Sequence, residues 1–75
     1  MSNEIEIRTD TAGTLLKIVV APNTRLAAGD DIAIMESMKM EIPLQAPAAG
    51  SVIEFLFEEG ATLEEDDVIA RFVAS

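Results

Sequence analysis

The feature that most constrains this chain is a repeat within it. Residues 12–35 align without a gap on residues 49–72, a shift of 37 positions, and six of the 24 aligned positions are identical. Asp30 meets Asp67, for example, and most of the other positions keep their apolar or polar character. Such a repeat indicates two similar halves related by a pseudo-two-fold axis. The point between the halves falls close to residues 36–41, which singles out that segment.

Within each half, apolar residues alternate with polar ones, which is the period of a β-strand. Residues 4–8 (EIEIR) show this alternation most plainly. The best helical candidate, residues 58–67, contains Gly60 and has no apolar stripe, so no helix is expected there. Asn23 is equivalent to Gly60 in the repeat, and both residues tolerate the positive φ of a tight turn. Further strands are expected around Leu15–Val20, Ile32–Ile34, Ile42–Leu44 and Val52–Phe57.

Composition excludes several classes of protein. The chain has no cysteine and no histidine, so it lacks thiolates, the commonest metal ligand and the commonest general base. We therefore predict no metal site, and we exclude a hydrolase that acts alone. Fourteen acidic residues against five basic ones give a net charge of −9, which repels nucleic acid and anionic lipid. A second interpretation of this charge is that it guides docking onto basic partner enzymes.

Length and N-terminus indicate a small free-standing protein. The 75 residues are expected to form one domain, residues 1–75, near the lower size limit for a hydrophobic core. The N-terminal segment has no basic patch followed by an apolar stretch, and no apolar run is long enough to span a membrane. We therefore expect a cytoplasmic protein without a membrane partner. The start at Met1, close to the first expected strand, favours a short whole protein.

Residues 34–42 break the local rules of a β-hairpin. Strand-like residues flank a turn that would centre on Met38 and Lys39, although two-residue turns favour Asn-Gly or glycine-containing pairs. Glu36 would then face Glu41, and like charges opposite each other are mildly destabilising. Segments that break such rules are more often functional than average. The alternative interpretation is that the methionines fold back onto the core and the lysine is an ordinary solvated side chain.

The motif Glu36-Ser37-Met38-Lys39-Met40 resembles the Glu-Ala-Met-Lys-Met signature of biotinyl domains, a family that includes biotin carboxyl carrier proteins. The resemblance continues through Gly29-Asp30 before the motif and through residues 46–52 (APAAGSV) after it. It covers residues 5–73, which is nearly the whole chain. Ser37 stands where the family usually has Ala, and this is a change from one small residue to another.

The resemblance implies an all-β fold, a flattened β-barrel or sandwich of two four-stranded antiparallel sheets with a pseudo-two-fold internal repeat. In this barrel-sandwich hybrid the lysine lies on an exposed hairpin at one end, and the chain termini lie at the other. No inserted thumb segment interrupts the first half, so the chain resembles the thumbless members. Asn23 and Asp66 stand where the family commonly has Gly, which concerns turns and not the modified lysine.

The resemblance also implies a function. Lys39 is the expected site of covalent biotin attachment by a biotin protein ligase. The biotin arm would shuttle a carboxyl group between a biotin carboxylase and a carboxyltransferase, and the chain itself would be a carrier without catalytic groups. Neighbouring residues are expected to be recognition contacts for the ligase or the carboxylase. Methionine suits this role because its side chain adapts to varied surfaces. These expected contacts are Glu36, Ser37, Met38, Met40 and Glu41.

Two other functions remain open on the sequence. A lipoyl carrier domain of a 2-oxo acid dehydrogenase-type system shares the fold and the hairpin lysine, and a short attachment protein could accept both cofactors. Lipoyl domains typically have Asp before and Ala after the lysine, whereas Lys39 lies between Met38 and Met40, which favours biotin. The other alternative is an unmodified β-barrel interaction module, which has no need of a Met-Lys-Met hairpin.

Overall fold

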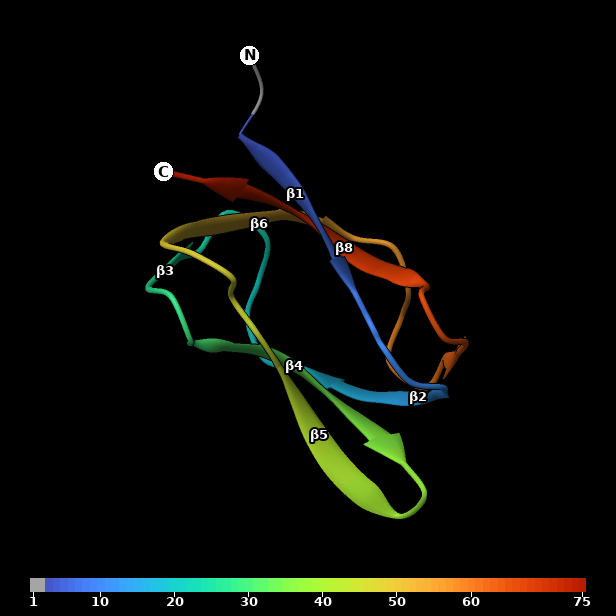
Figure 1. Ribbon diagram of the computed structural model, residues 1–75. Helices are drawn as coiled ribbons and strands as arrows, with labels where there is room; N and C mark the ends of the chain where they lie inside the picture. The colour runs from blue at the N-terminus through green and yellow to red at the C-terminus, as the bar shows by residue number, and fades with distance from the viewer. Residues whose placement is uncertain (1–2) are drawn as a thin grey trace.

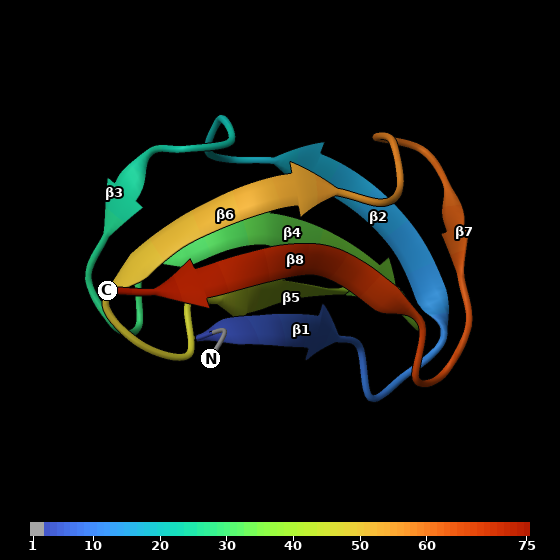
Figure 2. The same cartoon turned by 90° about the horizontal axis from the view of Figure 1, so that it is seen from above.

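The computed structural model describes residues 3–75 as two antiparallel β-sheets that face each other (Figures 1 and 2). Met1 and Ser2 of the expected domain lie outside these residues. One sheet has the strand order β1-β8-β6-β3 and the other β5-β4-β2-β7, so the expected fold class is confirmed. Within the described part, no helix is long and apolar enough to cross a membrane. The strands are β1 Glu4–Arg8, β2 Gly13–Ile18, β3 Arg25–Leu26, β4 Asp31–Ser37, β5 Met40–Gln45, β6 Gly50–Phe55, β7 Thr62–Leu63 and β8 Val68–Ala74.

The repeat extends over nearly the whole fold. A shift of 37 residues carries β2 onto β6, β3 onto β7 and β4 onto β8 with identical bounds. It also carries β1 onto all but the first residue of β5. The same shift exchanges the two strand orders and places the β-bulge of β2 on that of β6. The relationship expected from residues 12–35 therefore spans residues 4–74.

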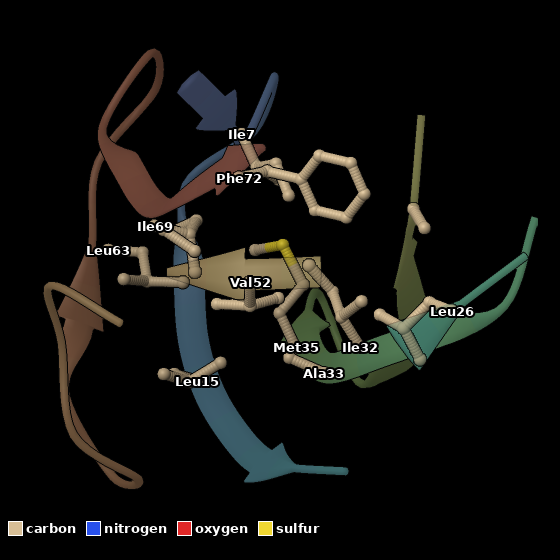
Figure 3. Close-up of a cluster of buried hydrophobic side chains, with 12 residues drawn as sticks. Ile7, Leu15, Leu26, Ile32, Ala33, Met35, Val52, Leu63, Ile69 and Phe72 are labelled. Carbon is tan, nitrogen blue, oxygen red and sulfur yellow. The ribbon is translucent and has the colours of Figure 1, made fainter. Parts of the chain in front are cut away.

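The core lies between the two sheets (Figure 3). Because successive side chains of a strand point to opposite faces, each strand sends its apolar positions inward. Phe72 of β8 and Met35 of β4 are equivalent in the repeat, and both are fully buried. Burying a side chain of this size stabilises the fold by roughly 1.5–3 kcal/mol. The buried apolar residues are Ile7, Leu15, Leu26, Ile32, Ala33, Met35, Ala46, Val52, Leu63, Ile69, Ala70 and Phe72.

Equivalent turns use equivalent chemistry. Asn23 and Gly60 have φ of 69° and 91°, as expected for the tight turns at these positions. The side chain of Asp30 accepts a hydrogen bond from the backbone N–H three residues before it, at 2.9 Å, and Asp67 does the same at 2.8 Å. Each carboxylate therefore closes the turn before β4 or β8, which explains why both halves of the repeat have Asp here.

Some strand details differ from the expectation. β3 and β7 are only two residues long, which is too short to show alternation in the sequence. Val20 and Phe57 lie beyond the ends of β2 and β6, although the apolar runs were expected to continue as strands through them. Both side chains pack against the core, so their apolar character reflects burial and not strand pairing.

Candidate functional site

The β4–β5 hairpin protrudes from the barrel at the end opposite to the start of β1 and the end of β8 (Figure 1). Glu36 pairs with Glu41 across the hairpin, and only Met38 and Lys39 are left between the two strands. The turn and its register are therefore those expected from the sequence. The structure brings all the predicted site residues, 36–41, together at one tip.

The tip is a two-residue turn with a left-handed backbone. The φ angles are 53° at Met38 and 67° at Lys39, and Asn and Gly adopt such angles most readily. For other residues this conformation costs roughly 1–2 kcal/mol each. The hairpin thus holds its lysine in a backbone conformation that works against stability, and the pairing of β4 with β5 offsets the cost.

The apolar side chains of the tip face solvent. Met38 is 92% exposed and Met40 is 64% exposed, whereas Met35 on the same hairpin is fully buried. The interpretation in which Met38 and Met40 fold back onto the core is therefore wrong. Neighbouring exposed apolar side chains are typical of a surface that contacts another molecule, and methionine adapts to partners of varied shape.

The charged side chains of the tip form no ion pairs. Glu36 and Glu41 are both exposed and lie opposite each other. Within residues 3–75, every salt bridge lies on the β1-β8-β6-β3 sheet, and none involves either glutamate or Lys39. The amine of Lys39 is therefore open to solvent and to an incoming partner.

Ser37 differs from the other predicted site residues because it is buried, with 9% of its surface exposed. Its Oγ lies 3.4 Å from Oγ1 of Thr11, on the connection between β1 and β2. The structure thus buries the Ser37 side chain next to the turn and does not offer it to partners. Thr11 was not predicted from the sequence, because it lies outside both the motif and the aligned residues 12–35.

The chemistry of the tip is that of a primary amine. Lys39 and Lys17 are the only lysines of the sequence, and Lys17 lies within β2 and pairs with Ile34 of β4. A lysine amine in water is almost entirely protonated at neutral pH and is then a poor nucleophile. The tip thus presents an amine to which an activated acyl group could be attached, and the sequence has no histidine to accept the proton of that amine.

Small attachment proteins are similar to this chain. It is 43% identical to the biotin/lipoyl attachment protein of Bacillus subtilis (strain 168) over 58 residues, which is 77% of this chain and 80% of that protein. It is 34% identical to the biotinylated protein TB7.3 homolog of Mycobacterium leprae over 65 residues, which is 87% of this chain and 92% of that protein. Both matches extend over most of each protein.

A large carboxylase contains a similar fold. The solved structure of the Kluyveromyces lactis urea carboxylase superposes on 97% of the chain with a TM-score of 0.90 and 29% identity, and the match covers 6% of that protein. The model of the biotin/lipoyl family, described as "biotin-requiring enzyme", matches residues 4–72. With the fold and the hairpin in agreement, this match shows that the chain belongs to the biotin/lipoyl attachment family.

Proposed function

We propose that this chain is a biotin carrier and that Lys39 is the residue that carries the biotin. The observation behind this proposal is the exposed Met38-Lys39 turn at the tip of a protruding hairpin, in a chain whose small relatives are named for biotin attachment. Lys39 fits such a group because an amide to biotin needs an accessible primary amine with room around it. Biotin, when attached, supplies the group that carries the carboxyl.

Attachment requires the amine to react with an activated biotin. We infer that a biotin protein ligase presents biotinyl-adenylate to the tip. The unprotonated Nζ of Lys39 attacks the acyl carbon, a C–N bond forms, and the C–O bond to the adenylate breaks. AMP leaves with the electron pair of that bond, and the nitrogen loses a proton to solvent. The resulting amide is neutral, so the positive charge of Lys39 is lost.

The neighbours of Lys39 supply contacts to the partner enzymes. Met38 and Met40 expose apolar area on both sides of the lysine, and Glu36 and Glu41 offer unpaired carboxylates to basic groups of a partner. We propose that the partners after attachment are a biotin carboxylase and a carboxyltransferase. The barrel keeps the docking surface fixed while the long side chain moves, and tethering raises the effective concentration of the attached group at each active site.

Intact-mass measurement after co-expression with a biotin protein ligase and free biotin tests this proposal. We expect one biotinyl group on the wild-type chain and on Lys17→Arg, which removes the other lysine as a matched control. We expect none on Lys39→Arg, which keeps the charge but not the nucleophile. A biotinyl group on Lys39→Arg would contradict the site.

The same measurement with a lipoate ligase separates the alternative functions. A lipoyl adduct without a biotinyl adduct would place the chain among the lipoyl carriers. No adduct with either ligase would overturn the carrier function and favour an unmodified interaction module.

A further inference from the structure

The two ends of the barrel have the same backbone arrangement but differ in their side-chain hydroxyl groups. Where the connection from β1 to β2 meets the hairpin, three residues carry side-chain hydroxyls. Their equivalents at the other end of the barrel, 37 residues later, are all alanines. The equivalent pairs are Thr9 and Ala46, Thr11 and Ala48, and Ser37 and Ala74.

The backbone does not need these hydroxyls. At the hairpin end, the N–H of Asp66 donates to the carbonyl of Thr9 at 2.8 Å. At the other end, the N–H of Gly29 donates to the carbonyl of Ala46 at 2.9 Å. Alanines therefore hold the same connection in the same place, and the hydroxyls are an addition confined to the hairpin end.

Thr9 is the centre of this addition and is 1% exposed. Its Oγ1 can donate to either of two acceptors, the carbonyl oxygen of Thr11 at 2.7 Å and Sδ of Met35 at 3.1 Å. Its oxygen accepts the N–H of Thr11 at 3.2 Å. Thr9 thus folds the connection back on itself, and Thr11 lies beside the end of β4, where the strand enters the turn.

Thr11 completes the link to the hairpin. Its Oγ1 lies 3.4 Å from Oγ of Ser37, the last residue of β4 and the second before Lys39. The connection runs from β1 in the opposite sheet, which Thr9 follows directly, to β2, which pairs with β4. The hydroxyl pair therefore joins the end of β4 to the connection between the two sheets, close to the point where the turn begins.

We propose that Thr11 and Ser37 are positioning residues for the modification of Lys39. By joining the end of β4 to the β1–β2 connection, they narrow the range of directions in which the tip presents its amine to the ligase. This proposal rests on the proposed function, in which Lys39 is the biotin acceptor. Neither residue contacts the reacting atoms, so their effect is on the fit between chain and ligase and not on the chemical step.

Steady-state biotinylation with varied acceptor chain tests the proposal, using Thr11→Ala and Ser37→Ala. Both variants are expected to fold, because alanine already occupies the equivalent positions of the other half. A hydrogen bond of this kind contributes modestly, so we expect KM for the acceptor to rise about 3- to 10-fold with kcat unchanged. The double variant should be no worse than either single one, because both changes break one contact. Thr11→Ser, which keeps the hydroxyl, should restore KM.

Asp30→Ala is the matched control. It removes a turn hydrogen bond before the start of β4, at the end of the hairpin far from the tip, so it lowers stability without changing a contact of Thr11 or Ser37. Amide hydrogen exchange of residues 38–40 in the unmodified chain gives a second readout that needs no ligase. We expect exchange there to accelerate about 3- to 10-fold in Thr11→Ala and Ser37→Ala, and not in Asp30→Ala.

Two results would overturn the positioning role. One is a KM and an exchange rate in Thr11→Ala and Ser37→Ala that match those of Asp30→Ala. The other is a failure of Thr11→Ser to restore either value. If the wild-type chain accepts no biotin, the proposed function fails. Hydrogen exchange still tests the contact between Thr11 and Ser37 separately, and unchanged exchange in Thr11→Ala and Ser37→Ala would refute its effect on the hairpin.

Discussion

β4 and β8 occupy equivalent places in the two sheets, but their outer faces differ. On β8, the guanidinium of Arg71 pairs with Glu4 at 2.7 Å and with Glu54 at 2.5 Å. At the equivalent place on β4 stands Ile34, and Lys17 takes the place of Glu54. Among residues 3–75, one sheet therefore has an outer face closed by ion pairs, while the sheet that bears the hairpin has an outer face without any.

The same contrast holds along the strands. β4 continues through a two-residue turn into β5, whereas the equivalent strands β8 and β1 pair side by side without a turn between them. Features that stabilise the fold, such as the buried positions of Phe72 and Met35 and the turn aspartates, occur in both halves. Features of the candidate site occur once. The residues that hold the barrel together are therefore duplicated, whereas those of the exposed hairpin tip are not.

Truncating the equivalent core residues should have the largest effect. We expect Phe72→Ala to lower the free energy of unfolding by about 3–5 kcal/mol and Met35→Ala by about 2–5 kcal/mol, because each leaves a cavity in a fully buried site. Urea unfolding of both variants, beside Phe72→Leu and Met35→Leu, measures the difference. If Met35→Ala lowered the free energy of unfolding more than Phe72→Ala, the size of the buried side chain would not decide how much each of the two positions contributes.

Two equivalent glycines should give the next largest effect. A Cβ on Gly13 would overlap the carbonyl oxygen of Glu36, and one on Gly50 would overlap that of Val73. Because the obstacle is backbone in both cases, we expect Gly13→Ala and Gly50→Ala to cost similar amounts, about 1–3 kcal/mol or more. The two variants should differ in function, because Glu36 lies three residues before Lys39. Only Gly13→Ala should slow biotin incorporation per folded molecule, and equal slowing in both variants would contradict this.

Much of this arrangement could be predicted from the sequence because it depends on local pattern. The alternation of residues 4–8 and the register of Glu36 with Glu41 both follow from side-chain period and turn length. β3 and β7 could not be predicted, since two residues show no period. The link between Thr11 and Ser37 could not be predicted either, because it joins residues far apart in the chain through a contact between a connection and a strand end. The repeat carried a signal for it, namely hydroxyls opposite alanines.

A change of the turn residue should give a smaller effect of opposite sign. Met38 has a φ of 53°, and Asn tolerates that angle better, so Met38→Asn is expected to raise the free energy of unfolding by about 1 kcal/mol. Asn23 has a similar φ of 69°, so the opposite substitution, Asn23→Met, should lower the free energy of unfolding by a similar amount. Met38→Asn should also weaken ligase recognition, since an exposed apolar contact is lost. A destabilised Met38→Asn would show that other contacts support the methionine there.

Removing the ion pairs of the closed face should have the smallest effect, and its pH dependence is what identifies it. Arg71→Ile copies Ile34 onto β8 and removes the exposed pairs with Glu4 and Glu54, which are individually weak. The hydrogen bond from Arg71, aided by its charge, lowers the pKa of Glu4 below its ordinary 4.5. A carboxyl whose pKa is lowered on folding stabilises the protein above its unfolded pKa, and that contribution is lost as pH falls through the folded pKa.

Arg71 itself stays charged throughout, because the same hydrogen bonds raise its pKa further. Wild type should therefore exceed Arg71→Ile in stability at about pH 7 and lose that advantage in acid, once the pH has fallen below the lowered pKa of Glu4. Molar salt should shrink the difference at neutral pH, since these side chains are partly exposed. Thermal unfolding at neutral and at acidic pH, with and without salt, measures it. A difference that persists in acid would mean that Arg71 acts by packing its stem on the sheet, and the two outer faces would then differ less than their charges indicate.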